Sequence, residues 1–505
     1  MGETKQSRVE ETLDPQDWEA LRALGHRMVD DMLAYLENVR DRPVWQPIPD
    51  EVRAHFRQPL PVEGEDAATV YEEFLRYVLP HPQGNIHPRF WGWVIGTGTP
   101  TGMLAEMLAA GMNPNVGGGD QVSTEVEGQV LEWCKQMLGF TRQASGLLVS
   151  GGSMANLVGL TVARNARADF NVAQDGVQQS TRRLTLYASR EAHSSVQKSV
   201  ELLGLGNDAL RRIPVNAGFQ VEIDALLDAI SEDRARGYQP FCIVGNAGTV
   251  NTGAFDDLNR LADVCRDEGM WLHVDGAFGA LAALSAPLRP LVAGMERADS
   301  LAFDLHKWMY VPYEAGCVLV RHADEHHRAF SAAGAYLSHA ERGLSGGALW
   351  FSEYGVQLSR GFRALKIWMS LKEHGIEKYG RLVQQNVEQA RYLAALVKAE
   401  DGELELLAPV PLNIVCFRYR DARAAQQQSQ LNRLNEELLA RLQESGIAAP
   451  SSTVLDGSYA LRVAITNHRS RREDFDLLVG KVLELGRELA RETASGTSRP
   501  SVSGT

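Results

Sequence analysis

The sequence predicts an α/β fold in which a mostly parallel β-sheet is covered by helices on both faces. Two observations support this prediction. From about residue 145, short apolar runs typical of buried strands alternate with amphipathic stretches typical of helices. Polar and charged residues that could bind a ligand or take part in catalysis follow the ends of several of these runs. Ligands bind at these strand ends in parallel sheets.

The predicted elements follow from apolar runs and from apolar residues spaced about 3.6 apart. The predicted strands are Leu147–Val149, Leu184–Ser189, Phe241–Gly245, Trp271–Asp275, Ser300–Phe303 and Cys317–Arg321. The helical stretches between them include Ser153–Arg167, Ser194–Gly204 and Asp256–Glu268.

An amphipathic helix is predicted before this region. Asp14 followed by Pro15 is typical of a helix start, and apolar residues from Trp18 to Leu36 recur near helical spacing. No neighbouring segment in the sequence covers this apolar stripe. We therefore expect the helix to pack on another domain or on a second subunit.

Beyond the alternating region, Ser331–Gly347 is rich in glycine, alanine and serine and predicts a long loop. Helices are then expected at Phe362–Glu373 and Glu388–Ala399, followed by an α+β tail with strands Asn413–Tyr419 and Tyr459–Ile465 and helix Arg472–Arg491. The expected organisation is a helical segment (1–90), a large domain (91–375), a small domain (376–492) and a disordered tail (493–505).

Composition narrows the class of protein. The 505 residues include 51 Lys and Arg against 64 Asp and Glu, a net charge of −13, which argues against nucleic-acid or anionic-membrane partners. Five scattered cysteines without a CxxC pair indicate reduced thiols, and no cluster of metal ligands is apparent. Neither a signal peptide nor an apolar run of about 20 residues is present, so a soluble cytoplasmic protein is expected.

The segment from Ser150 to Asn156, which contains Gly151-Gly152-Ser153, lies between a predicted strand and a predicted helix. Glycines allow close approach of the backbone to a ligand, and a helix N-terminus offers free N–H groups to an anion. The segment therefore suits a phosphate, although a simple tight turn explains it equally well.

Two charged residues follow neighbouring predicted strands. Asp275 ends an apolar strand, where a carboxylate is costly unless it is paired, and a protonated pyridine nitrogen is one such partner. Lys307 lies 307 − 275 = 32 residues further on, where desolvation makes its amine nucleophilic and suited to a Schiff base. A helix cap or salt bridge for Asp275 and a solvated side chain for Lys307 are the alternatives. Together with the glycine turn, the two residues favour a pyridoxal phosphate site.

At this point the chain resembles a known family, the group II pyridoxal-phosphate decarboxylases, and most of all the aromatic L-amino acid decarboxylases among them. The resemblance spans about residues 15 to 490 and is carried by segments Ala34–Arg40, His87–Phe90, His193–Val196, Trp271–Ala277 and Ala298–Trp308. It implies an aspartate-aminotransferase-like (fold type I) domain with a seven-stranded sheet. It also implies a homodimer whose active site lies at the subunit interface.

The resemblance also implies roles for individual residues. Lys307 would carry pyridoxal phosphate as a Schiff base, Asp275 would pair with the pyridine nitrogen, and His193 would stack on the ring face opposite Ala277. Tyr336 would protonate the substrate carbon after carbon dioxide leaves. The remaining contacts are Gly152, Ser153 and His306 to the phosphate and Thr249 to the ring hydroxyl or the substrate carboxylate.

Several positions depart from the family pattern. Asp304 stands where many relatives have Asn near the phosphate, which leaves its contact with the cofactor open. Val94-Ile95-Gly96 replaces Phe-Pro-Thr in the side-chain pocket, and Ser359 stands where aromatic decarboxylases often have Gly and histidine decarboxylases Ser. Arg462 is a candidate partner of the substrate carboxylate, because its forked donors suit that group, or else a surface arginine.

The expected function is decarboxylation of an L-amino acid, with an aromatic substrate favoured. Decarboxylation of acidic amino acids or histidine, an aldehyde synthase or aminotransferase reaction, and a non-catalytic scaffold are the alternatives. Tyr336 argues against the aldehyde synthase, because relatives that form aldehydes tend to have Phe at that position.

Overall fold

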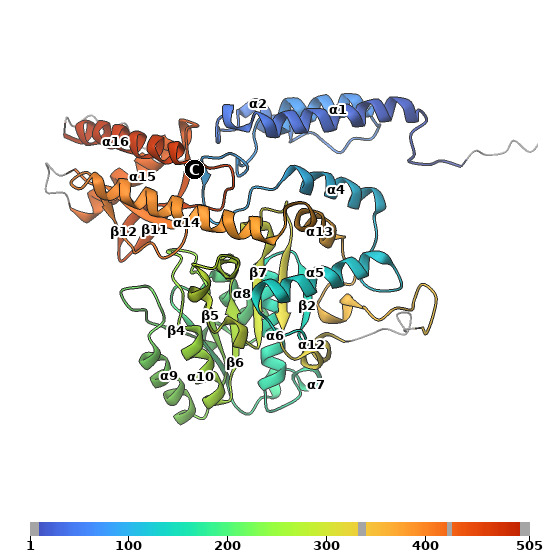
Figure 1. Cartoon of the computed structure of the whole chain (residues 1–505), viewed down its shortest axis with the longest axis vertical. Helices are drawn as coiled ribbons and strands as arrows, with labels where there is room; N and C mark the ends of the chain where they lie inside the picture. The colour runs from blue at the N-terminus through green and yellow to red at the C-terminus, as the bar shows by residue number, and fades with distance from the viewer. Residues whose placement is uncertain (1–9, 332–339, 422–426, 495–505) are drawn as a thin grey trace, which may run out of the picture.

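The computed structural model describes residues 10–331, 340–421 and 427–494. Its main layer is a seven-stranded sheet with the order β2-β8-β7-β6-β5-β3-β4, in the lower half of Figure 1. Strands β4, β3, β5, β6 and β7 pair in parallel, and β8 runs antiparallel to both β7 and β2. The predicted mostly parallel, seven-stranded sheet is confirmed. Its strands are β2 (Ser145–Val149), β3 (Leu184–Ser189), β4 (Leu210–Ile213), β5 (Gln239–Asn246), β6 (Trp271–Asp275), β7 (Ser300–Asp304) and β8 (Gly316–Val320).

Helices cover both faces of this sheet, since every residue of β6, β7 and β8 is buried. Helix α6 packs across β5 to β8, and α10 packs on β5 and β6. The sequence prediction missed β4 at the sheet edge. The helices of this part are α4 (Pro100–Met112), α5 (Val122–Leu138), α6 (Gly152–Arg167), α7 (Val172–Asp175), α8 (Ser194–Leu202), α9 (Ile223–Ala235), α10 (Leu258–Glu268), α11 (Leu305–Trp308), α12 (Ala323–Phe330) and α13 (Arg363–His374).

A second sheet of five strands lies above the first, with the order β1-β11-β12-β10-β9. Its strand β1 pairs in parallel with β11, so a segment near the N-terminus completes a sheet that otherwise comes from the C-terminal part. Trp91 of β1 stacks on Phe475 at a centroid distance of 4.9 Å in the core of this unit. The elements are β1 (Phe90–Trp91), β9 (Leu404–Leu406), β10 (Ile414–Tyr419), β11 (Ala449–Leu455), β12 (Ser458–Ala464), α14 (Ile376–Ala399), α15 (Gln428–Glu444) and α16 (Arg472–Ala494).

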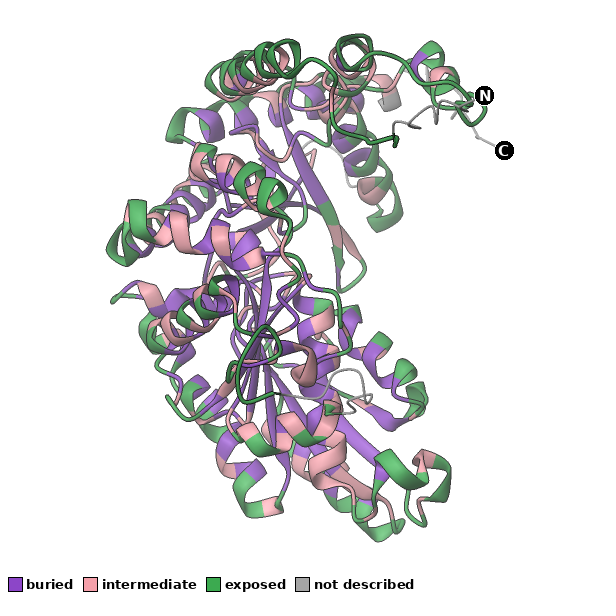
Figure 2. Cartoon of the chain, turned by 90° about the vertical axis from the view of Figure 1, so that its right-hand side faces the viewer, coloured by how far each residue is buried: buried purple, intermediate pink, exposed green. Residues whose placement is uncertain are grey.

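The N-terminal helices α1 (Trp18–Glu37), α2 (Asp50–His55) and α3 (Ala67–Glu73) extend along the top of the molecule (Figure 1). The predicted helix start at Asp14 is wrong, because Asp17 is the N-cap and accepts hydrogen bonds from the Glu19 and Ala20 amides. Not one residue of α1 is buried, and the helices at this end are largely exposed in Figure 2.

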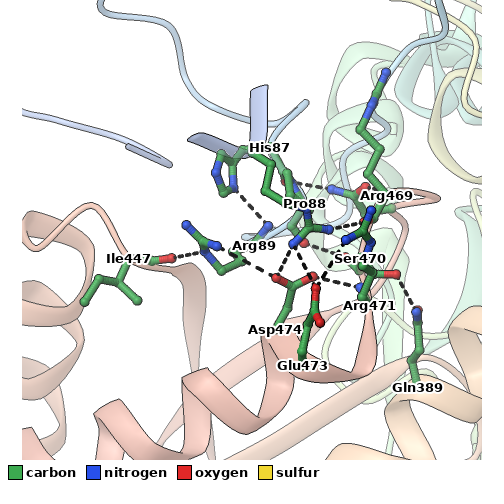
Figure 3. A network of polar contacts seen from close by, with 12 residues as sticks. His87, Pro88, Arg89, Gln389, Ile447, Arg469, Ser470, Arg471, Glu473 and Asp474 are labelled. Carbon is green, nitrogen blue, oxygen red and sulfur yellow. Dashed lines mark hydrogen bonds and ion pairs between the residues drawn. The ribbon is translucent and has the colours of Figure 1, made fainter. Parts of the chain in front are cut away.

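A network of polar contacts fixes residues 87–89 to the C-terminal part of the chain (Figure 3). Arg89 Nε donates to the Ile447 carbonyl at 2.7 Å, and Ser470 Oγ donates to the Pro88 carbonyl at 2.5 Å. Arg40 forms an ion pair with the buried Asp474 at 2.7 Å. Since residues 93–96 follow directly, this network also positions the segment that borders the cavity described below.

All five cysteines are buried, unpaired thiols, as their scattered spacing predicted. Within residues 10–331, 340–421 and 427–494, no helix combines the length and the apolar character needed to cross a membrane.

A buried ion pair joins α5 to the segment before α13. The Glu127 and Arg360 side chains, 0% and 1% exposed, bind each other through both guanidinium Nη atoms. Arg360 also donates to the carbonyls of Val116 and Leu148, each at 2.7 Å. Burial raises the pKa of Glu127, and the Arg360 charge partly offsets that effect. The pair therefore ties α5, β2 and two loops together.

We expect Arg360→Leu to lower the free energy of unfolding by about 3–5 kcal/mol, because it leaves the Glu127 carboxylate buried without its partner. Urea unfolding followed by circular dichroism measures this change. The double variant Glu127→Leu/Arg360→Leu should regain a large part of the lost stability, since it leaves no buried charge without a partner. A double variant less stable than Arg360→Leu would contradict this explanation.

Candidate active site

A cavity of about 480 Å³ lies at the carboxyl ends of β5, β6 and β7, beside the N-terminus of α6. Because these strands are parallel, their last residues Asn246, Asp275 and Asp304 meet at one edge of the sheet. The cavity is lined by Trp93, Val94, Ser150, Gly151, Gly152, Ser153, Met154, Asn156, His193, Ser195, Asn246, Gly248, Val250, Asp275, Ala277, Phe278, Asp304, His306, Lys307 and Glu314.

The glycine turn brings the α6 backbone close to the groups at the end of β7. A Cβ atom on Gly151 would lie 3.2 Å from His306 Cε1, and one on Gly152 would lie 3.0 Å from Asp304 Oδ2. The absence of side chains at these two positions therefore permits the approach. The turn presents the amino end of a 16-residue helix to the cavity, which suits an anion.

Lys307 lies in the single turn α11 directly after β7, as its position after an apolar strand predicted. Its Nζ is 2.7 Å from Asp304 Oδ2. Beside it, His306 Nδ1 accepts a hydrogen bond from the Ala315 amide at 3.1 Å, so the imidazole proton resides on Nε2. Burial lowers the pKa of His306 to about 4, and the ring is therefore a neutral donor at physiological pH.

Asp275 is held by two donors on the neighbouring elements. Asn156 Nδ2 donates to Asp275 Oδ2 at 2.8 Å, and the Ala277 amide donates to Asp275 Oδ1 at 3.1 Å. Since the amide nitrogen of Asn156 faces a carboxylate, its oxygen must accept, and His273 Nε2 supplies that hydrogen at 2.9 Å. Burial lowers the pKa of His273 to about 4, consistent with a neutral donor.

The same Asn156 amide reaches His193. Asn156 Nδ2 donates to Ser195 Oγ at 2.9 Å, and Ser195 Oγ lies 2.8 Å from His193 Nδ1. The Ser195 amide also donates to that nitrogen, so His193 caps α8. Burial lowers the pKa of His193, while the nearby Asp275 charge raises it. Asn156 thus links the two residues, a role that sequence reasoning did not assign.

The structure does not bring every predicted residue to the cavity. In the described part of the chain, Thr249, Ile95, Ser359 and Arg462 lie outside the lining. Thr249 Oγ1 lies 3.1 Å from Thr252 Oγ1, and Ser359 is exposed. The Arg462 guanidinium is buried and donates to the carbonyls of Trp93, Val250 and Asn251 instead. Tyr336 lies outside the described residues.

Trp93 is a lining residue that the sequence analysis missed. It has a φ of 49°, rare for a residue with a large side chain, and its side chain is 57% exposed at the cavity. The Ser451 hydroxyl accepts from its amide at 3.1 Å, and Arg462 Nη1 donates to its carbonyl at 2.9 Å. These bonds hold the strained residue. No local sequence signal marks it, because both partners come from the distant strands β11 and β12.

Comparison with known proteins gives consistent matches. A family model described as "Pyridoxal-dependent decarboxylase conserved domain" matches residues 49–420. The aromatic-L-amino-acid decarboxylase of Bacillus atrophaeus is 34% identical over 476 residues, covering 94% of this chain and 96% of the relative. The histidine decarboxylase of Drosophila melanogaster is 32% identical over 473 residues, covering 91% of this chain and 54% of the relative. The solved structure of Oryza sativa TDC with PLP and tryptamine matches with a TM-score of 0.88 and 26% identity, covering 95% of this chain and all 100% of that chain.

The cavity fits pyridoxal phosphate with one exception. It combines an anion-binding turn, a lysine amine and a carboxylate fixed by two N–H donors, which suit a phosphate, an aldehyde and a pyridine nitrogen respectively. The exception is the Asp304 carboxylate, which lies beside the turn that would hold the phosphate.

The buried imidazoles predict acid sensitivity. His273 and His306 each have a pKa near 4 in the folded protein, below the ordinary value of about 6.5 that applies after unfolding. The unfolded chain therefore binds protons that the folded protein does not. Stability should be full above about pH 6.5 and decline as the pH falls towards 4, by roughly 2 kcal/mol for each imidazole at about pH 5.

Urea unfolding at a series of pH values measures this decline. The variant His273→Gln, which keeps a donor for Asn156 but does not titrate, should show a shallower loss of stability than the unsubstituted protein. Identical pH dependence in both proteins would show that His273 does not contribute.

Proposed function

The chain belongs to the family of pyridoxal-dependent decarboxylases, and from this we propose that it converts an aromatic L-amino acid into its amine and carbon dioxide. It is a carboxy-lyase that uses pyridoxal 5'-phosphate as cofactor. The observation that carries the proposal is the convergence of Lys307, Asp275 and His193 on one cavity beside the amino end of α6.

We assign the following roles to the residues that hold the cofactor. The Lys307 amine would anchor the aldehyde carbon, and Asp275 would accept a hydrogen bond from the protonated ring nitrogen. His193 would cover one face of the cofactor ring and Ala277 the other. The amino end of α6 at Gly152, the Ser153 hydroxyl and the neutral His306 would donate to the phosphate, and Thr249, which lies outside the cavity lining, is kept as a candidate for the ring hydroxyl.

When bound, the cofactor supplies a conjugated ring that accepts the electron pair released as the carboxylate leaves. The residues of the chain set the conditions for this chemistry. Asn156 and the Ala277 amide fix the position of the Asp275 carboxylate, so that its oxygens would face the ring nitrogen of the bound cofactor. Tyr336 is the proposed proton donor to the substrate carbon, an assignment that rests on the family resemblance alone.

The cavity wall supports an aromatic substrate. Trp93 and Val94 present apolar surface at its border. Within the described lining, Lys307 is the only lysine or arginine, and it is assigned to the cofactor, so no cation remains for an acidic substrate side chain. The 34% identical relative, which is named for aromatic L-amino acids, supports the same choice. Histidine is the second candidate, because Ser359 matches the histidine decarboxylase pattern.

We further propose a homodimer with the active site at the subunit interface. Helix α1 has no buried residue, and Trp18, Leu21 and Leu33 are 59%, 39% and 38% exposed along its length. An exposed apolar stripe of this kind is suited to a second copy of the chain. Ser359 is exposed and lies outside the cavity of its own subunit. Five unpaired thiols support a cytoplasmic location.

The function is tested by incubating the protein and cofactor with a panel of L-amino acids and measuring carbon dioxide and amine. Tyrosine, tryptophan and dopa should be converted, and glutamate should not. Lys307→Ala should lose at least about a thousandfold in turnover, because the anchoring amine is gone. Lys372→Ala, which removes an exposed lysine of α13, is the control and should retain activity.

Each other outcome has a definite meaning. Release of aldehyde and peroxide would identify an aldehyde synthase, and turnover of histidine alone would identify the second candidate. Full turnover by Lys307→Ala would overturn the assigned mechanism. Failure to bind the cofactor would indicate a non-catalytic scaffold.

The dimer is tested by sedimentation velocity. Trp18→Glu/Leu21→Glu should shift the protein from dimer to monomer, because it places charges in the proposed contact. Val454→Glu, at a residue of β11 that is also 59% exposed, is the matched control and should leave the dimer intact. A monomeric unsubstituted protein, or a double variant that stays dimeric, would contradict the proposed interface.

A further inference from the structure

A carboxylate lies at the end of the cavity where the chain offers donors to an anion. Asp304 ends β7 and is 1% exposed. Its Oδ2 atom is 2.7 Å from Lys307 Nζ and 3.8 Å from His306 Nε2. The side chain therefore contacts the group that anchors the cofactor and one of the groups assigned to its phosphate.

The Asp304 carboxylate also packs against the glycine turn. A Cβ atom on Gly152 would lie 3.0 Å from Oδ2, and one on Gly316 would lie 2.8 Å from Oδ1. Among the described residues, Oδ1 has no hydrogen-bond partner although it is buried. An unsatisfied buried carboxylate oxygen beside an anion-binding turn is costly, because such an atom normally has a donor.

The charges around Asp304 leave it without a permanent cation. The titratable groups that face it are Lys307 and His306 from α11, Tyr313 and Glu314 before β8, and His193 at the start of α8. Burial lowers the pKa of His306 to about 4 and raises the pKa of Tyr313 to about 12, so both are neutral near pH 7. Glu314 is itself an acid that pairs with Arg363 at 2.7 Å. Lys307, whose Nζ is 2.7 Å from Asp304 Oδ2, is assigned to the aldehyde of the cofactor.

We propose that Asp304 and the phosphate of the cofactor share one proton, so that this chain takes up a proton from solvent when it binds the cofactor. The proton lies between a carboxylate oxygen and a phosphate oxygen, and no other bond changes. Two anions in contact without a cation cannot both remain ionised. Affinity for the phosphorylated cofactor therefore falls as the pH rises. The inference rests on the proposed position of the phosphate at α6 and is independent of the substrate.

A simpler role for Asp304 is to orient the Lys307 amine. That role concerns the aldehyde end of the cofactor and is the same for pyridoxal, which lacks the phosphate. Proton sharing concerns the phosphate alone. The ratio of the affinities for pyridoxal phosphate and pyridoxal separates the two roles.

The test measures both affinities by absorbance titration and equilibrium dialysis on the full-length protein after dialysis to remove cofactor. For the unsubstituted protein, the ratio of the affinity for pyridoxal phosphate to that for pyridoxal should fall as the pH rises from about 6.5 to about 8.5. The expected slope is up to tenfold per pH unit. Asp304→Asn keeps the shape but removes the charge. At the higher pH its preference should exceed that of the unsubstituted protein by at least about tenfold. Calorimetry in two buffers of different ionisation enthalpy should show one proton fewer taken up by Asp304→Asn.

Two further variants make the outcome decisive. Asp299→Asn removes a half-buried carboxylate just before β7 and should leave the preference for pyridoxal phosphate over pyridoxal, and its pH dependence, unchanged. Ser153→Ala should weaken pyridoxal phosphate but not pyridoxal, because it removes a phosphate donor. If Ser153→Ala has no effect on the preference, the proposed phosphate position is wrong. If Ser153→Ala acts as expected and Asp304→Asn matches the unsubstituted protein, proton sharing is overturned while the proposed function stands.

Discussion

The parallel direction of β5, β6 and β7 is the constraint on which the site depends. Parallel strands end at the same edge of a sheet, so Asn246, Asp275 and Asp304 come together although long crossover connections separate them in sequence. Helix α6 packs across the same strands and starts at that edge. The backbone topology therefore brings the strand ends, which carry the carboxylates, to the same edge of the sheet as the positive end of the α6 dipole.

One amide then organises the side chains on this scaffold. Asn156 bonds to Asp275, Ser195 and His273, and through Ser195 it reaches His193. A carboxamide has one acceptor and one donor group, and the Asp275 carboxylate, which only accepts, requires the nitrogen end to face it while the oxygen faces His273. The carboxylate that we propose as partner of the pyridine nitrogen and the imidazole that we propose to cover the ring are thus oriented by a common group. A substitution of Asn156 would therefore disturb the positions of Asp275 and His193 together.

The sequence predicted the parts of the fold and of the site that rest on local patterns. Six strands of the main sheet, Lys307 and Asp275 are apparent because buried parallel strands are apolar runs and the charged residues directly follow them. Strand β4, with Arg211 and Arg212 at an edge, has no such run. The packing of Arg462 against main-chain carbonyls and the left-handed Trp93 depend on contacts between distant segments, which no local pattern encodes. The predicted helix start at Asp14 differs from the observed N-cap at Asp17, because an Asp at either position can cap a helix.

The contact between Trp93 and Arg462 has a consequence for biosynthesis. The two residues are 369 positions apart, and Arg89 and Ile447 repeat the pattern over 358 positions. During translation, the segment that borders the cavity emerges from the ribosome long before its supports do. The seven-stranded sheet can assemble in the meantime, since its strands lie between these segments. In a nascent chain, Trp93 at the border of the cavity therefore lacks its partner Arg462 until β12 has been made.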